Sequence, residues 1–102
     1  MLIRSQDKMG IFNLTNIDTI CAKVDKDKEI KEHYETSIQY FCGGEEAMGI
    51  LGFYSTEEKA IKVLNAMQNA YASSIKLTIS SDGEMQWQRV PVIFQMPEDD
   101  EV

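Results

Sequence analysis

The sequence predicts an α+β fold, in which an antiparallel sheet of about five strands is packed by one long helix over residues 56–73. Three observations support this class: short segments alternate apolar with polar residues, one segment places apolar residues at helical spacing, and turn residues separate the segments. A C-terminal β-hairpin and an edge strand are expected after the helix. The 102 residues suit one domain, which we place at residues 1–97, with a disordered acidic tail over residues 98–102.

Four or five strands are expected before the helix, because apolar and polar residues alternate there in short runs. The first two, over residues 2–6 and 10–14, flank a turn-forming stretch that ends in glycine, so they should form a hairpin. The same alternation predicts strands over residues 18–24, 36–42 and 48–54. Consecutive short strands of this kind favour antiparallel pairing.

The helix has a recognisable start and one apolar side. Ser55 is expected to be the N-cap residue, since Glu58 follows it at the spacing of a capping box. Further along, apolar residues recur at helical spacing and form one stripe, made of Ala60, Val63, Leu64, Met67 and Tyr71. Because the stripe is confined to one side, the helix should lie on a sheet.

A hairpin and a further strand should follow the helix. Alternating residues over 75–79 and 84–90 flank an Asp-Gly dipeptide at residues 82–83, which is typical of a two-residue hairpin turn. The last apolar run, residues 90–96, contains Pro91. Proline cannot donate a ladder hydrogen bond, so this run belongs at a sheet edge or ends the fold.

Charge and hydropathy argue against two classes of partner. The formal net charge is −7, from 10 Lys+Arg and 17 Asp+Glu, and such an acidic chain lacks the basic footprint that binds a nucleic-acid backbone. More than half of the net charge comes from the four acidic residues 98–101, which weakens the idea of an acidic face that imitates nucleic acid. No run approaches the roughly 18–20 apolar residues that span a bilayer, and no secretory signal opens the chain. We therefore expect a cytoplasmic protein that does not bind membranes.

Metal, cofactor and catalytic sites are not expected. The soft metal ligands are Cys21, His33 and Cys42, which are too few and too widely spaced for a zinc site. Both cysteines should be free thiols that pack as small apolar residues in strands. No nucleophile carries a local catalytic signature, so we predict no enzyme activity. The alternative is a thiol or hydrolytic enzyme that pairs either cysteine with His33.

Met85, Trp87 and Arg89 share one face of the expected C-terminal hairpin and form the candidate partner or ligand surface. A tryptophan in this setting can stack on a flat ligand or bury itself in a partner protein. A small domain, however, needs its large side chains inside. The favoured interpretation is therefore that Trp87 covers the core or the helix.

The chain also carries three segments of a recognisable kind: IRSQDK at residues 3–8, YSTEEKAIKVL at residues 54–64 and FQMPEDDEV at residues 94–102. Together they resemble a family of small uncharacterised proteins from Gram-positive bacteria and their phages. That family has no known activity, cofactor or catalytic residue. The resemblance therefore implies a bacterial or mobile-element origin and adds no functional site.

The leading hypothesis is a small non-enzymatic interaction module that self-associates as a two-fold dimer. Several strands should have exposed edges, which need a cover or a partner, and the second hairpin is rich in Met, Trp and Ile. The alternative is a phage or mobile-element accessory protein that blocks or sequesters a host protein or a small nucleotide ligand. Small size, acidity and the family resemblance favour this alternative.

Overall fold

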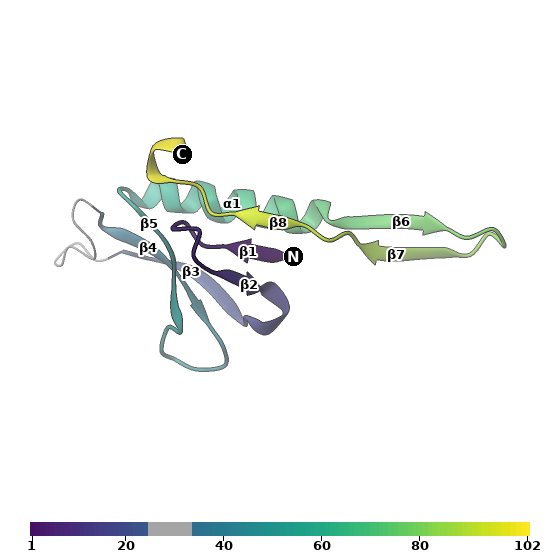
Figure 1. Ribbon diagram of the computed structural model, residues 1–102, viewed down its shortest axis with the longest axis horizontal. Coiled ribbons are helices and arrows are strands. Elements are labelled where there is room, and N and C mark those ends of the chain that lie inside the picture. The colour runs from purple at the N-terminus through teal and green to yellow at the C-terminus, as the bar shows by residue number, and fades with distance from the viewer. Residues whose placement is uncertain (25–33) are drawn as a thin grey trace.

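The computed structural model describes residues 1–24 and 34–102, and this part of the chain forms one α-helix and three small sheets. The molecule is elongated, with extents of 60 × 30 × 22 Å. Two three-stranded sheets and the helix form a body, and a two-stranded ribbon projects from one end of it (Figure 1). The predicted α+β class is confirmed. The prediction of one sheet of about five strands is wrong.

The N-terminal sheet joins the two ends of the chain. Its order is β2-β1-β8, in which β1 (Leu2–Arg4) is antiparallel to β2 (Ile11–Asn13) and parallel to β8 (Ile93–Gln95). The hairpin of β1 and β2 is as predicted, and β8 lies at a sheet edge, as Pro91 indicated. Because β2 and β8 occupy both edges of β1, no edge of that strand is left for the central strands. The central strands form a separate sheet.

The central sheet is antiparallel and has the order β3-β4-β5. Its strands are β3 (Thr19–Val24), β4 (Thr36–Phe41) and β5 (Gly49–Tyr54), each within one residue of the predicted bounds. The ring of Tyr40 on β4 contacts the ring of Phe12 on β2, with 4.9 Å between the ring centroids. The central sheet therefore packs directly on the N-terminal sheet.

Gln6, just after β1, also ties these two sheets together. Its backbone N–H donates a hydrogen bond of 2.9 Å to the carbonyl of Leu51. Its side-chain amide donates to the carbonyl of Phe53 and accepts from the Phe53 N–H, both at 2.9 Å. The amide thus pairs with β5 as another strand would, and it donates as well to the carbonyl of Pro97 at 3.1 Å. One side chain links both sheets to the C-terminal segment.

The helix α1 (Glu57–Ser73) spans the predicted residues but has a different N-cap. Thr56 caps it, because the Thr56 hydroxyl oxygen accepts a hydrogen bond of 3.2 Å from the Lys59 N–H. The prediction that Ser55 is the cap is wrong. Ser55 instead donates its N–H and its hydroxyl to the carboxylate of Asp99. The residue whose spacing to Glu58 favoured it as the N-cap is therefore bonded to the C-terminal segment.

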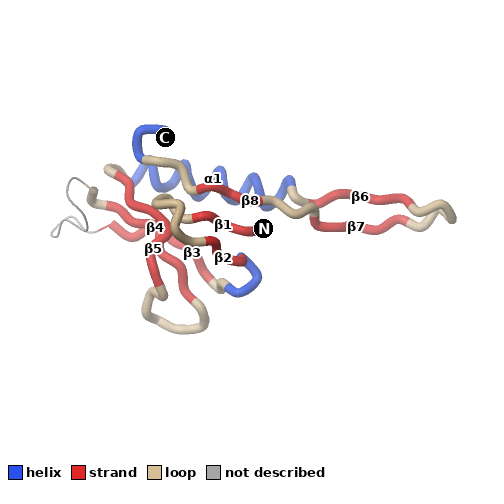
Figure 2. The backbone as a smooth tube through the Cα atoms, viewed as in Figure 1, coloured by secondary structure: helices blue, strands red, loops and turns tan. Residues whose placement is uncertain are grey.

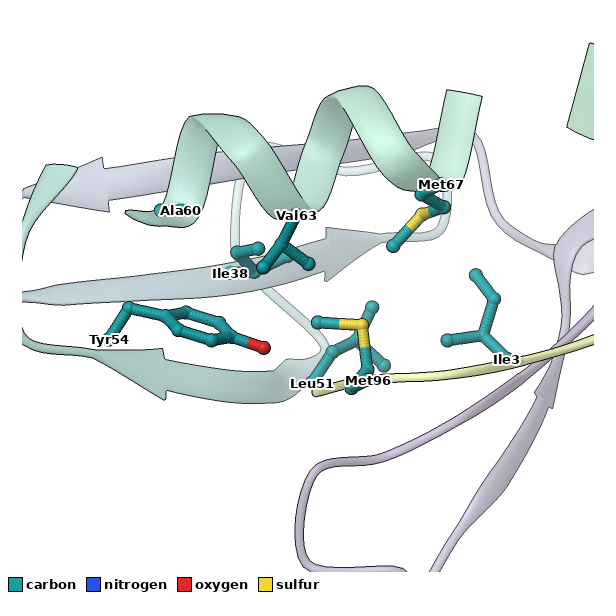
Figure 3. Close-up of a cluster of buried hydrophobic side chains, with 8 residues drawn as sticks. All are labelled: Ile3, Ile38, Leu51, Tyr54, Ala60, Val63, Met67 and Met96. Carbon is teal, nitrogen blue, oxygen red and sulfur yellow. The ribbon is translucent and has the colours of Figure 1, made fainter. Parts of the chain in front are cut away.

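The core lies where the helix packs against both sheets of the body. Figure 3 shows the helix side chains close to those of the central sheet, with Ile3 and Met96 contributed by the two ends of the chain. The Tyr54 hydroxyl in this cluster donates a hydrogen bond of 2.8 Å to the carbonyl of Pro97. Burial first, and then the nearby acidic C-terminus, raises the pKa of Tyr54 well above its ordinary value. The buried apolar residues are Ile3, Ile38, Leu51, Tyr54, Ala60, Val63, Met67 and Met96.

The acidic C-terminus is ordered, contrary to the predicted disorder of residues 98–102. Asp99–Glu101 form a short 3-10 helix. The Asp99 carboxylate accepts hydrogen bonds of 2.8 and 3.0 Å from the N–H and hydroxyl of Ser55, and it lies 3.5 Å from the Lys59 ammonium. Partial burial opposes the charge of Asp99, but the Ser55 and Lys59 contacts outweigh it and hold the pKa of this carboxyl below its usual value. The tail is therefore fixed at the N-terminal end of α1.

Candidate interaction surface

The ribbon that projects from the body is the C-terminal hairpin. Its strands, β6 (Ile75–Ile79) and β7 (Met85–Arg89), pair antiparallel with each other and with no other strand in the described parts of the chain. We call residues 75–89 the arm. Figure 2 shows both strands of the arm extending beyond the C-terminal end of α1, away from the two sheets of the body.

One side of the arm is apolar and exposed. The register places Ile75, Leu77 and Ile79 opposite Arg89, Trp87 and Met85, so these six side chains share one face. Trp87 is 73% exposed, Ile79 68% and Met85 64%. The expectation that Trp87 covers the core or the helix is therefore wrong. We call this side the apolar face of the arm, defined by Ile75, Leu77, Ile79, Met85 and Trp87.

Arg89 fixes the arm to the end of the helix. Its guanidinium carbon lies 3.7 Å from the centroid of the Tyr71 ring, a cation–π contact. The same group donates to the Tyr71 carbonyl at 3.2 Å and to the hydroxyl of Ser74, a buried residue, at 3.0 Å. The Val90 N–H adds a hydrogen bond of 2.6 Å to the Ser74 carbonyl. Arg89 thus belongs to the predicted surface but serves to position the arm.

The tip of the arm is a well-bonded turn, although not the predicted two-residue type. The Gly83 N–H donates to the Ser80 carbonyl, and the Ser80 N–H donates to the Glu84 carbonyl, both at 2.9 Å. Gly83 has a φ of +84°, a conformation that glycine adopts without strain. Asp82 accepts hydrogen bonds from the Ser80 hydroxyl and the Glu84 N–H, and these, the Ser80 bond foremost, lower its pKa. The turn therefore holds the two strands in register.

An open apolar hollow lies beside the C-terminal half of α1. Its volume is about 300 Å³, and Gln68 is the polar residue among those that line it. Tyr71, whose ring contacts the guanidinium of Arg89 in the arm, also lines the hollow. We call this hollow the groove. Its lining residues are Met1, Leu14, Ile20, Leu64, Met67, Gln68 and Tyr71.

The sequence contained only part of this arrangement. The predicted helical stripe included Leu64 and Tyr71. In the structure Leu64 is half-buried and Tyr71 is 37% exposed, so neither belongs to the buried core. Met1, Leu14 and Ile20 reach the groove through the packing of distant elements, for which local patterns give no signal. The groove was therefore missed, whereas the face with Met85 and Trp87 was found.

The other candidate residues do not form a site in the part of the chain that the structure describes. Cys21 is half-buried on β3, Cys42 is exposed, and both are free thiols. His33, their alternative partner, lies outside the described residues. Among the residues described, no three His, Cys, Asp or Glu side chains gather to hold a metal ion, and no described helix has the length and apolar character to cross a bilayer.

Fold and surface together define a class: a small α+β protein with an apolar β-hairpin arm. No protein-family profile matches the sequence, and the comparisons with curated proteins and with solved structures also gave no match.

Proposed function

We propose that this protein is a small, non-enzymatic interaction module of the cytoplasm that self-associates through the apolar face of the arm. The observation that carries the proposal is the exposure of that face, where the single tryptophan of the chain is 73% exposed. Contiguous apolar patches on the surface of a small protein mark sites of interaction. Here the patch lies on an element that projects from the body, where a partner can reach it.

The arm also needs an additional layer for its own stability. A two-stranded ribbon is marginally stable in water unless a third strand or a packed surface supports it. The strands of the arm pair only with each other in the described chain, and every strand residue except Thr78 is exposed. A partner that covers the apolar face would supply the missing layer. Binding and the stability of the arm are therefore linked.

Trp87 has the position expected of a residue that dominates a binding interface. It lies in the middle of the apolar face, opposite Leu77 and between Met85 and Arg89 on its own strand. A few residues near the centre of an interface contribute most of its binding energy, and tryptophan is enriched among them. Trp87 is 73% exposed, so most of its apolar area is available to a partner.

The alternative function, the binding of a host protein or a small nucleotide by a phage accessory protein, uses the same residues. The family resemblance and the net charge of −7 support it. A nucleotide suits the geometry less well than a protein, because Trp87 stands on an open ribbon and the guanidinium of Arg89 is engaged by Tyr71 and Ser74. Self-association is the function that we put first.

Light scattering coupled to size exclusion tests the proposal. The wild-type protein should have twice the chain mass of 11.6 kDa at micromolar concentration. Trp87→Ser should shift it to the monomer, because it removes the central apolar side chain without touching the core. Gln86→Ser is the matched control, since Gln86 is exposed on the opposite face of the same strand.

Two results would contradict self-association through the arm. A wild-type monomer throughout the micromolar range, with a host protein bound in a Trp87-dependent manner, would favour the accessory-protein alternative. A dimer that Trp87→Ser leaves intact would assign self-association to another surface.

A further inference from the structure

The groove and the apolar face of the arm form a strip along the molecule whose two parts are joined by Arg89 at the base of the arm. Arg89 projects from the same face of β7 as Trp87, because it lies two positions further along the strand. The Arg89 guanidinium lies over the Tyr71 ring, and Tyr71 lines the groove. The apolar face therefore meets the groove at Tyr71, where the arm joins the helix.

The two halves of this strip have similar lengths. From Ile75 to Ile79 the arm extends about 13 Å, at the usual strand rise of about 3.3 Å per residue. From Leu64 to Tyr71 the helix beside the groove advances about 10 Å, at 1.5 Å per residue. The groove volume of about 300 Å³ is at the lower end of the range for pockets that bind ligands. It suits one large anchoring side chain, with smaller residues at its margin.

The arm cannot fill the groove of its own chain in this arrangement. Arg89 and Val90 hold its base against Tyr71 and Ser74, and the arm extends away from the helix end (Figure 1). A two-fold axis near the base would place each arm over the groove of the other copy. In a two-fold dimer each arm–groove contact occurs twice, so the buried surface area is twice that of one contact. This doubling brings a small contact closer to the total of about 1,600 Å² that is typical of stable interfaces.

The charge distribution favours a second copy in spite of the acidic chain. The arm region, residues 75–90, contains two basic and two acidic side chains, and the side chains that line the groove carry no charge. The excess negative charge of residues 98–101 lies at the opposite end of α1, where Asp99 contacts Ser55 and Lys59. Two copies can therefore meet at the arm and groove with little electrostatic repulsion.

We infer that the protein forms a reciprocal dimer in which the arm of each copy lies in the groove of the other, with Trp87 as the anchor. This inference rests on the proposed function and specifies the surface that receives the arm. Self-association by edge-to-edge pairing of two arms would use Trp87 but leave the groove empty. The test therefore has to change the groove without changing the arm.

Gln68→Arg changes the groove. Gln68 lies on an exposed position of α1 and lines the groove, so the longer charged side chain should obstruct docking without entering the core. The dissociation constant of the dimer should rise at least about tenfold, as for loss of a hot-spot contact. Asn69→Arg adds the same side chain at the next helical position, which is exposed and does not line the groove, and should leave the dimer unchanged.

Mixing two defective variants gives the decisive result. Trp87→Ser retains an intact groove, and Gln68→Arg retains an intact arm, so their mixture should form a heterodimer with one complete arm–groove contact. Light scattering should show association in the mixture that neither variant shows alone. The fluorescence of the single tryptophan, supplied only by the Gln68→Arg chain, should shift to the blue as Trp87 enters the groove of its partner.

The outcomes separate this inference from the proposed function. If Trp87→Ser abolishes the dimer while Gln68→Arg does not, the arm mediates self-association but binds elsewhere, and only the inference is overturned. The same conclusion follows if both variants are monomeric and their mixture shows no heterodimer even at concentrations far above the wild-type dissociation constant, which are needed because one contact binds more weakly than two. A monomeric wild-type protein would overturn both.

Discussion

The strands β4 and β6 carry the same alternation of apolar and polar residues, yet they differ in what covers their apolar side. On β4, Ile38 is completely buried between the helix and the sheets of the body. On β6, Leu77 is 39% exposed and Ile79 68% exposed. The pattern in the sequence therefore predicts that a strand has an apolar face, while the covering layer is decided elsewhere: α1 supplies it for β4, and the described chain supplies none for β6.

The attachment of the two regions differs in the same way. The body is held by side chains from distant parts of the chain, such as Gln6 between the two sheets and Asp99 at the start of α1. In the described part of the chain, the arm is held at its base, by Arg89 and Val90. A protein with a stable body can present such an arm to a partner, because the arm contributes little to the packing of the rest.

A matched pair of leucine substitutions should show the largest difference between body and arm. Leu51 on β5 is 1% exposed and Leu77 on β6 is 39% exposed. Leu51→Ala should lower the free energy of unfolding by about 2–5 kcal/mol, because it leaves a cavity in the core. Leu77→Ala should lower it by less than about 1 kcal/mol. Urea unfolding followed by circular dichroism, in the Trp87→Ser background to exclude self-association, measures both.

Similar losses for the two variants would contradict this division. They would mean that the arm packs on the body in solution and that Leu77 belongs to the core. The comparison between a buried and an uncovered strand would then have no basis.

The elements with strong local patterns were predictable. The helix, the strands of the central sheet and both hairpins lie close to their predicted bounds, because periodicity and turn residues are local properties. The parallel pairing of β1 with β8 was not predictable in this way. This pairing joins strands near opposite ends of the chain. The alternation of apolar and polar residues in β1 and β8 does not depend on which strand each of them pairs with, so it cannot identify the partner.

The same limit explains the errors at individual residues. Ser55 has the better spacing for a capping box, but the contact with Asp99 takes its hydrogen-bonding groups and Thr56 becomes the cap. The tail looks disordered because it is acidic and terminal, yet Ser55 and Lys59 bind it. Trp87 was expected inside because it is large. Its exposure follows from the projection of the hairpin, which depends on the Arg89 contacts at the helix end.

The tail contact should make the body sensitive to acid. The Asp99 carboxyl has a lowered pKa in the folded protein, so its contribution is complete above the unfolded pKa of about 4 and is lost as the pH falls through the folded value. Asp99→Asn should lower the free energy of unfolding at neutral pH by about 1 kcal/mol, since charged hydrogen bonds contribute somewhat more than this before solvent screening. Asp100→Asn makes the same charge change in the same tail and is the control.

Urea unfolding at neutral pH and near pH 2 measures the effect. The difference between the two variants should shrink as the pH falls through the lowered pKa of folded Asp99, because the protonated carboxyl no longer carries the charge that Ser55 and Lys59 stabilise. Equal stability of the two variants at neutral pH would show that the tail does not hold the start of α1. A difference that persists at low pH would show that the charge of Asp99 is not its source.

Substitution of Gly83 should weaken the arm while leaving the body unchanged, and it is the smallest effect that we expect. An alanine Cβ at this position meets no atom within 4 Å, so the conformational cost of the substitution comes from the φ of +84° alone. This cost is about 1 kcal/mol for a non-glycine residue.

The conformational cost at Gly83 should disturb the turn that keeps Trp87 opposite Leu77. If the arm must be ordered to bind, the dissociation constant of the dimer should rise by about fivefold for each arm in the interface, while the unfolding of the monomeric Trp87→Ser background should hardly change. Ser81→Ala, in the same turn at a residue without a positive φ, should leave the dimer intact. A Gly83→Ala dimer as tight as that of Ser81→Ala would show that the arm is shaped by its partner during binding rather than ordered beforehand by its own turn.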